Sequence, residues 1–535
     1  MSRRWLLGLL SLILAVSGVA FTREFQSPAA APPGPDRIAP VVVDYISYEW
    51  YMATWSDQEM VCSIIVDHEG MPLPGEVYRD CGEEVYSEWI VQPPCGTKIK
   101  DTCDGYYAVF VRSTPAQKEI PMELAPASAW ISLEGCEPVL STSTNICESV
   151  PAIVISGIEP LPNETITSIG GTYDGRNFDC DNTNTCKIPV SETPKDGVNV
   201  EFWSYSTYGD SSEVFTARVR VQKMDEGDPD RLYWYADVLS SQWQGHNVAT
   251  CSDAWNVFPP VGGPPVWLST PKQSEDLSSD IPYTYLAYNL IMQGQVDARA
   301  CPDGGVTAGS VNQCGLEASR PAVKAWQNQF DELILTTAQE TGVPARLLKN
   351  LFARESQFWP GSFQNSDDAG LGQLTENGAD TTLFWNTNFY EDFCPLVFEG
   401  DTCGAGYMHL EDDARTLLRH ALVNSVNATC EECPLGLDLA QADYSVGVFA
   451  HSMIANCEQA GQVVKNYSLR SPGQVASFED LWKFTLVNYN AGGGCLADAV
   501  SKAFGNNPVL TWENVSPFLT GACSGAVDYV NDISK

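Results

Sequence analysis

The sequence has little positive charge. It holds 30 lysine and arginine residues against 68 aspartate and glutamate residues, with five histidines, for a formal net charge of −38. Binding to nucleic acid or to an anionic membrane surface needs clustered cations, so neither partner is expected. The chain also lacks a G-x-S-x-G elbow, an H-E-x-x-H motif and a Walker-type loop. Nothing therefore indicates a serine hydrolase, a zinc protease or a nucleotide hydrolase.

Long apolar runs are also scarce, with one exception near the N-terminus. Arg3 and Arg4 precede an apolar run over residues 5–21, which ends in small residues. This pattern is typical of a signal peptide, so we predict that residues 1–26 direct export to the extracellular space or cell surface. An uncleaved N-terminal membrane anchor is the alternative. No cysteine follows the run, so a lipoprotein anchor has no acceptor thiol, and the Pro- and Ala-rich residues 27–40 indicate a linker.

Cysteine is abundant, and 18 of them in an exported chain predict disulfides. Two groups of four can close within themselves: Cys62, Cys81, Cys95 and Cys103, then Cys136, Cys147, Cys180 and Cys186. Nine cysteines up to Cys251 face nine from Cys301 onward, so full oxidation needs a bridge between the two sets, and Cys251 is the best candidate. Cys430-x-x-Cys433 has no second CxxC or histidine pair at ligand spacing, so no metal or other cofactor is expected.

The length of 535 residues indicates several domains. Short β-prone runs separated by Gly, Pro and Asp predict a β domain over residues 41–124 and a second over 128–223, both as small immunoglobulin-like sandwiches. Residues 228–319 show no dominant period and are expected to be a connector. From residue 320 to residue 535 the period is helical. The predicted fold class is thus multidomain, with two β units before a mainly α catalytic domain.

Glu355 stands out within the helical part. Pro344 is a helix-start signal, and the apolar stripe through Leu351 and Phe352 places Glu355 on the buried face of the helix. Burial disfavours the ionised carboxyl and raises its pKa, as a general acid near neutral pH requires. The competing interpretation is structural: Glu355 forms an ion pair with a basic residue of the same helix, namely Arg346, Lys349 or Arg354.

Four motifs follow one another in an informative order. They are Glu355-Ser356, Gly370-Leu371-Gly372-Gln373, Tyr489-Asn490-Ala491-Gly492, and a final Trp512-to-Phe518 stretch followed by Tyr529-Val530. Together they resemble the soluble lytic transglycosylase family of glycoside hydrolases, which have a lysozyme-like α fold. The resemblance covers roughly residues 320 to 532. It implies that Glu355 is catalytic and that Ser356, Gln373, Tyr489, Asn490 and Tyr529 bind substrate.

The resemblance also implies a substrate and a reaction. The substrate is peptidoglycan glycan strands, cut at the β-1,4 bond between N-acetylmuramic acid and N-acetylglucosamine with formation of 1,6-anhydromuramic ends. A hydrolysing lysozyme of the goose type is the alternative, because one of three further carboxylates could position a water. These are Asp367, Asp368 and Glu376. Their other interpretation is a solvated loop.

The chain departs from the family pattern at three places. Gly372 replaces the usual Met, Leu519-Thr520 stand where many members have Glu-Thr, and the segment between Gln373 and Tyr489 is long and cysteine-rich. A non-catalytic wall-binding protein is therefore a third hypothesis. The β units carry no acid/base constellation, and we expect them to space the catalytic part or to bind a cell-surface or wall ligand.

Overall fold

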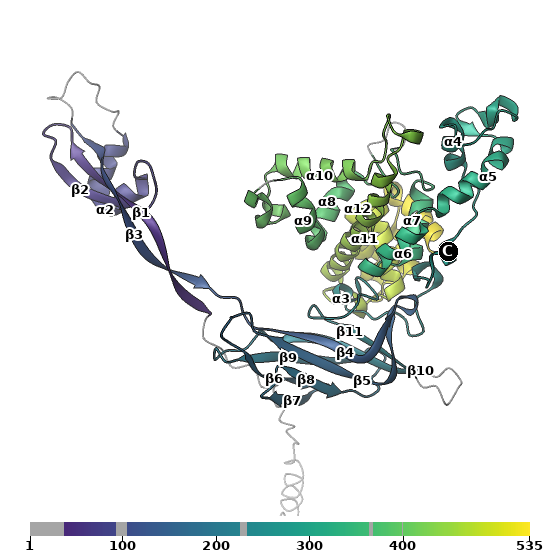
Figure 1. Ribbon diagram of the computed structural model, residues 1–535, viewed down its shortest axis with the longest axis horizontal. Coiled ribbons are helices and arrows are strands. Elements are labelled where there is room, and N and C mark those ends of the chain that lie inside the picture. Colours follow the sequence, from purple (N-terminus) through teal and green to yellow (C-terminus); the bar gives the residue numbers. More distant parts are fainter. Residues whose placement is uncertain (1–36, 92–103, 225–232, 363–367, 399) are drawn as a thin grey trace, which may run out of the picture.

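The computed structural model describes residues 37–91, 104–224, 233–362, 368–398 and 400–535. Figure 1 shows three parts: a long β arm, a broad antiparallel sheet at its base, and a helical part above the sheet. The order predicted from the sequence, β-rich first and mostly helical later, is confirmed.

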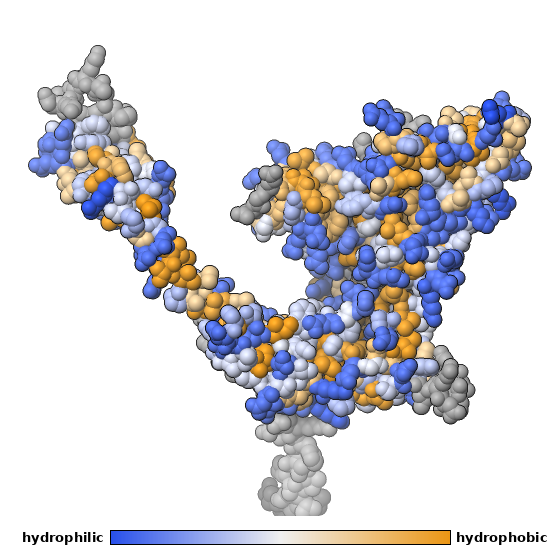
Figure 2. Space-filling view, viewed as in Figure 1, coloured by the Kyte–Doolittle hydropathy of each residue, from blue (hydrophilic) through white to orange (hydrophobic). Residues whose placement is uncertain are grey.

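The arm consists of three strands and a helix. Strand β1 (Ile38–Thr54) pairs with β3 (Tyr106–Glu123) along its whole length, whereas β2 (Met60–Val66) pairs only with the second half of β1. Helix α2 (Pro74–Val91) packs on the three-stranded end and helps to enclose a small core. That core contains Met52, Ile64, Val66, Val77 and Val85. The two-stranded remainder is a narrow ribbon with apolar side chains on its surface (Figure 2).

This arm differs from the predicted sandwich over residues 41–124. The described residues of this unit form one three-stranded sheet and a helix, with no second sheet, so a sandwich is the wrong architecture here. The sequence pattern missed α2 for a physical reason. The helix is interrupted at Gly82, which has φ 84° and ψ 173°, and only two of its residues are buried, so its apolar period is short.

The second part is an antiparallel sheet of eight strands in the order β4-β5-β11-β10-β9-β6-β7, with β8 also paired to β5. The strands are β4 (Ser128–Val139), β5 (Thr144–Ile158), β6 (Ile166–Tyr173), β7 (Arg176–Asp181), β8 (Thr185–Pro189), β9 (Val198–Ser206), β10 (Phe215–Met224) and β11 (Tyr233–Leu239). Strand β5 pairs with β4 on one edge, and with β11 and β8 at the two ends of its other edge. The sheet therefore curls on itself, and the enclosed side chains form one apolar core.

Arg37 fastens the base of the arm to this sheet. Its guanidinium donates to both carboxylate oxygens of Glu159 at 2.7 and 2.8 Å and to those of Asp210 at 2.6 and 2.9 Å. All three side chains are buried. The hydrogen bonds from Arg37 lower the pKa of Glu159 to about 2. A buried cation that satisfies two carboxylates fixes how the arm leaves the sheet.

The third part is helical and begins before residue 320. Its α-helices are α3 (Ser252–Trp255), α4 (Thr284–Met292), α5 (Gln313–Asn328), α6 (Asp331–Thr341), α7 (Ala345–Glu355), α8 (Glu376–Trp385), α9 (Thr387–Phe393), α10 (Asp412–Val426), α11 (Leu439–Ser468), α12 (Phe478–Asn506), α13 (Trp512–Val515) and α14 (Gly525–Ile533). Short 3₁₀ turns and a two-residue hairpin, β12 (Val306–Thr307) with β13 (Ser310–Val311), complete it.

The stretch predicted as a connector, residues 228–319, is divided between two folded parts. Strand β11 lies inside the eight-stranded sheet, and Trp255, Trp267 and Leu286 belong to the same continuous apolar core as helices α5 to α14. Trp255 also donates to the Cys457 carbonyl at 2.9 Å. The residues after β11 therefore belong to the helical part and do not form a linker.

The cysteine predictions can be compared with eight disulfides, and none of the described cysteines is free. The predicted bridge from Cys251 to the C-terminal set is confirmed, with Cys457 as its partner. The second group of four closes as Cys136–Cys147 and Cys180–Cys186, and the first group contains Cys62–Cys81, with Cys95 and Cys103 outside the described residues. The remaining pairs are Cys301–Cys314, Cys394–Cys403, Cys430–Cys433 and Cys495–Cys523.

These disulfides are those of a protein in an oxidising, extracellular type of environment. Among the residues with described positions, none of the helices combines the length and the apolar character needed to cross a membrane. The predicted signal peptide or anchor, residues 1–26, and most of the predicted linker lie outside the described residues.

Candidate functional site

Glu355 is the last residue of α7, and the sequence explains that position. The helix begins at Ala345, directly after Pro344, as predicted, and Leu347, Leu348 and Leu351 are fully buried. The helix ends at Glu355, because Gln357 and Phe358 adopt positive φ values of 49° and 65° and turn the chain away. Glu355 therefore lies at a helix end, partly buried, where a carboxyl group can meet substrate.

Helix α14 brings Tyr529 to Glu355. The Asn350 side chain donates to the Ile533 carbonyl at 2.9 Å, and Arg354 forms an ion pair with Asp532 at 3.4 Å, so α14 is held against α7. The Tyr529 hydroxyl, on a side chain that is 2 % exposed, donates to Oε1 of Glu355. The two residues are 174 positions apart in the chain, and only the fold joins them.

The environment of Glu355 shifts its proton affinity strongly. Burial raises the pKa of Glu355 from 4.5 to about 7, although the hydrogen bond from Tyr529 and the nearby charge of Arg354 act in the opposite direction. The charge of Asp368 adds a smaller upward shift. Because desolvation is the largest cause, the protonated form persists close to neutral pH. This is the property that the sequence predicted for a general acid.

None of the three basic residues suggested as structural partners of Glu355 forms an ion pair with it. Lys349 forms a buried ion pair with Asp331, Arg354 pairs with Asp532, and Arg346 donates to the backbone carbonyl of Asp276. Within the described residues Glu355 takes part in no ion pair closer than 4.0 Å. A partly buried carboxyl group without a cationic partner is costly for stability, which favours a functional reason for it.

The turn that contains Gln373 packs directly under α7. Ser356, fully buried, donates from its hydroxyl to the Leu371 carbonyl at 2.7 Å and so ties the helix end to the turn. Ala369 and Leu374 close the turn by paired backbone hydrogen bonds. The Gln373 amide nitrogen donates to the Gly370 carbonyl at 2.7 Å and more weakly to the Gly361 carbonyl at 3.3 Å. Ser356 and the Gln373 amide nitrogen thus hold the turn, which leaves the Gln373 carbonyl oxygen for a ligand.

Tyr489 joins this turn from α12. Its hydroxyl donates to the Gly372 carbonyl at 2.6 Å, and burial together with the charges of Glu355 and Asp368 raises the pKa of Tyr489 well above its usual value. A Cβ atom on Gly372 would lie 2.5 Å from the Phe449 ring and 2.8 Å from the Tyr489 hydroxyl. Close packing therefore favours glycine at position 372.

Phe449 is the residue of this site that the sequence did not indicate. It is fully buried on α11, and its ring meets that of Phe352 edge-on at 5.8 Å between centroids. The only sequence signal was indirect: Gly372 stands where the family that the motifs resemble carries Met, and a smaller residue there implies that another side chain fills the space.

Asn490 lies next to an interruption of α12. Gly492 adopts φ 81° and ψ 162° and divides the helix, and Asn490, two residues before it, is exposed. The preceding Asn488 is buried and donates to Asn456 and Gln459 at 2.8 Å each. Asn488 thus holds α12 against α11, whereas Asn490 is free to face a ligand.

The three carboxylates that kept hydrolysis open have different surroundings. Glu376 begins α8 and forms an ion pair with Arg419 at 3.0 Å, with His420 at 3.7 Å. Asp368 lies close enough to Glu355 and Tyr489 to raise the pKa of both. Asp367 is outside the described residues. Asp368 is therefore the one described carboxylate of the three that electrostatics couples to Glu355.

The arrangement supports acid/base chemistry at one carboxyl group, surrounded by two tyrosines and a rigid turn. Three cavities in the described chain, of about 610, 600 and 410 Å³, do not have Glu355 in their lining. No groups of three or more potential metal ligands occur among the described residues. No family model, curated protein or solved structure matches this chain.

Proposed function

We propose that this chain is an exported peptidoglycan-cleaving enzyme, a lytic transglycosylase that cuts the β-1,4 bond between N-acetylmuramic acid and N-acetylglucosamine. One observation supports this proposal most: Glu355, with its pKa raised to about 7, is hydrogen-bonded by Tyr529 and lies beside Tyr489 and the Gln373 turn. The four resembling motifs thus converge on one place in the fold.

The chemistry follows from the proton affinity of Glu355. In its protonated form Glu355 donates a proton to the glycosidic oxygen as the bond to C1 of the muramic residue breaks, and the saccharide with the new hydroxyl group leaves. The substrate N-acetyl group stabilises the positive charge at C1, as in glycosidases with one catalytic carboxylate. Glu355, now ionised, then accepts the proton of the muramic C6 hydroxyl. The C6 oxygen bonds to C1, closing a 1,6-anhydro ring and restoring protonated Glu355.

Neighbouring groups have supporting roles in this proposal. The hydrogen bond from Tyr529 stabilises the carboxylate produced by the first proton transfer, which keeps Glu355 from holding its proton too tightly. Gln373 and Asn490 orient the saccharide through amide groups, which bind hydroxyl and acetamido groups in fixed geometry. Ser356 and Tyr489 keep the turn in register with α7.

A hydrolysing lysozyme of the goose type is the second candidate, and Asp368 is the observation that favours it. Its charge acts on Glu355, so a water held between the two carboxyl groups would attack C1 in place of the C6 hydroxyl. In that case the product carries a reducing end. A non-catalytic wall-binding protein is the remaining possibility.

The finer fold assignments belong to this proposal. We propose that the helical part has a lysozyme-like fold and that the curled eight-stranded sheet is an immunoglobulin-like unit that binds or spaces at the cell surface. Their support is the single helical core around α7, α11 and α12, and the closed apolar core of the sheet.

Product analysis on purified peptidoglycan tests the proposal. Mass spectrometry separates the candidates, because a 1,6-anhydromuramic end weighs one water less than a reducing end. Anhydro products support the transglycosylase, and reducing products in their place identify the hydrolase. The absence of any released muropeptide over a range of pH values would reject both and leave a binding protein.

A further inference from the structure

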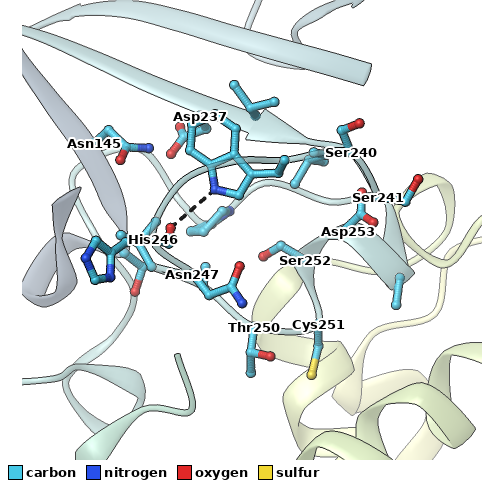
Figure 3. Close-up of a pocket in the computed structure, with 18 of the residues that line it drawn as sticks. Asn145, Asp237, Ser240, Ser241, His246, Asn247, Thr250, Cys251, Ser252 and Asp253 are labelled. Atoms are coloured by element: carbon cyan, nitrogen blue, oxygen red, sulfur yellow. Dashed lines mark hydrogen bonds between the residues drawn. The ribbon is translucent and has the colours of Figure 1, made fainter. Parts of the chain in front are cut away.

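A second polar site lies at the junction between the sheet and the helical part. A cavity of about 610 Å³ is lined by residues from β11, from the segment that follows it, and from α9 and α11. Figure 3 draws 18 of its lining residues and labels ten, and most of the labelled residues have hydroxyl, amide or carboxyl groups. None of the residues of the Glu355 site lines it.

Two carboxyl groups in this cavity have no cationic partner. Asp253 and Glu458 form no side-chain hydrogen bond or ion pair with any residue in the described ranges. Desolvation raises the pKa of both groups, although Asp253 is exposed and Glu458 is half-buried, and the charge of Asp253 raises the pKa of Glu458 further. Asp237, the third carboxylate of the lining, differs because Arg220 holds it at 2.7 Å.

Ser252 gives an independent indication of a ligand. The side chain is 2 % exposed and lines the cavity, yet its hydroxyl has no hydrogen-bond partner. In Figure 3 this hydroxyl points towards the middle of the ring of labelled residues, opposite Asn247. A buried hydroxyl without a partner is costly, and a polar ligand would remove that cost.

The lining restricts the chemistry of the ligand. It contains no lysine or arginine, so a phosphate or carboxylate ligand meets no permanently charged cation. Hydroxyl and amide groups are numerous and suit a ligand with several hydroxyl groups. The two unpaired carboxylates suit a positive charge on that ligand, since a charge-assisted hydrogen bond is the strongest contact they can make. Trp243, also in the lining, offers an aromatic surface for a sugar ring or a cation.

We propose that this cavity binds an amino sugar, a small polyhydroxylated ligand with an ammonium group, through Asp253, Glu458 and Ser252. The inference does not depend on the proposed reaction at Glu355. A ligand bound here contacts both the sheet and α11, so it stabilises the junction between the two parts.

Calorimetric titration of the full chain at neutral pH with glucosamine, N-acetylglucosamine and glucose tests the proposal. The three sugars differ at one ring position, where they carry an ammonium, an acetamido or a hydroxyl group. We expect glucosamine to bind roughly tenfold or more tightly than the other two, as expected of one charge-assisted hydrogen bond, and to raise Tm. Equal affinities for the three sugars, or no binding of glucosamine at about 10 mM, would overturn the proposal.

Variants locate the binding. Glu458→Gln removes one charge with little change of shape and should weaken glucosamine binding roughly tenfold, with the affinity for glucose unchanged. Asp253→Asn serves the same purpose if the first variant does not fold. Glu332→Gln, an exposed residue of α6 outside the cavity, is the control and should leave binding unchanged. An unchanged affinity for glucosamine in both cavity variants would overturn the assignment. Tighter binding of Ca²⁺ than of glucosamine, with displacement of the sugar, would also overturn it.

Muropeptide release is measured on the same preparations. Protein that binds glucosamine without cleaving peptidoglycan supports this inference and contradicts the proposed function. Protein that cleaves peptidoglycan without binding glucosamine supports the proposed function and contradicts this inference.

Discussion

At the scale of single residues, Glu355 is where function can be tested most directly. Replacing its carboxyl group by an amide keeps the shape and removes the proton. We expect Glu355→Gln to lower the rate of muropeptide release by at least about 10² to 10⁴-fold, the usual contribution of general acid–base catalysis. Circular dichroism should show an unchanged fold, and the variant should still bind glycan strands. A folded variant within about tenfold of the parent rate would mean that Glu355 is not the acid.

The same substitution has a predictable effect on stability. The pKa of Glu355 is about 7 in the folded protein against 4.5 ordinarily, so the folded state holds a proton that the unfolded chain releases. The stabilisation linked to this proton is complete below about pH 4.5 and is lost as pH rises through 7. At pH 8 the parent has lost on the order of 3 kcal/mol that Glu355→Gln does not lose. Urea unfolding at pH 4 and pH 8 measures this difference, and an equal free-energy gap at both pH values contradicts the assigned pKa.

Tyr529 tunes the acid and can be tested separately. Its hydrogen bond favours the ionised form of Glu355, so Tyr529→Phe should raise the pKa of Glu355 further. We expect the alkaline limb of the pH–rate profile to move up by roughly one unit. Tyr390→Phe is the control, since this buried tyrosine donates to the Cys403 carbonyl. An unmoved limb in Tyr529→Phe would show that the hydrogen bond does not act on the catalytic proton.

At the scale of elements, the turn between α7 and α8 depends on close packing at Gly372. A methyl group there meets the Phe449 ring and the Tyr489 hydroxyl, so Gly372→Ala should destabilise the protein by about 1–3 kcal/mol and lower activity. A second substitution, Phe449→Leu, should recover part of the loss because it returns space. Gly447→Ala serves as the control, because Gly447 lies on α11 with Phe449 and an added methyl group there meets nothing within 4 Å. Additive losses in the double variant would contradict the packing explanation.

Elements differed in how far the sequence predicted them. The start of α7 followed from Pro344 and its apolar stripe, because both are local properties of the chain. Helix α2 was missed because its apolar period is broken at Gly82. The residues before α5 were taken for a connector because their 3₁₀ turns and short helices have no long period, and Trp255 and Trp267 are buried by distant elements.

At the scale of the whole molecule, the Cys251–Cys457 disulfide spans 206 residues and anchors the segment after the sheet to α11. Replacing both cysteines by serine should lower the free energy of unfolding by about 2–5 kcal/mol, because the unfolded chain regains much freedom. The same change at Cys430 and Cys433, three residues apart, should cost less. Denaturant unfolding of both variants measures the difference, and non-reducing peptide mapping checks the pairing. A free Cys251 thiol in natively oxidised protein would contradict this connectivity.

Some features of this protein are local and could be determined from its sequence alone. Composition determined the acidic charge and the abundance of disulfides. The period of the apolar residues determined the β-to-α order and placed Glu355 on the apolar face of a helix. The parity of the cysteines even required a bridge between the two sets, and Cys251 was correctly chosen for it.

Only the tertiary structure decided the rest, because it depends on contacts between distant residues. Tyr529 meets Glu355 across 174 positions, Phe449 fills the space above Gly372, and Asp253 and Glu458 face one cavity from two different parts. The sheet curls because β5 pairs with three strands, and the ribbon of the arm is likewise a pairing of distant strands. No local pattern in the sequence specifies these pairings. Proton affinity, packing tolerance and cavity chemistry arise from what surrounds a residue in space, which the chain fixes only when it folds.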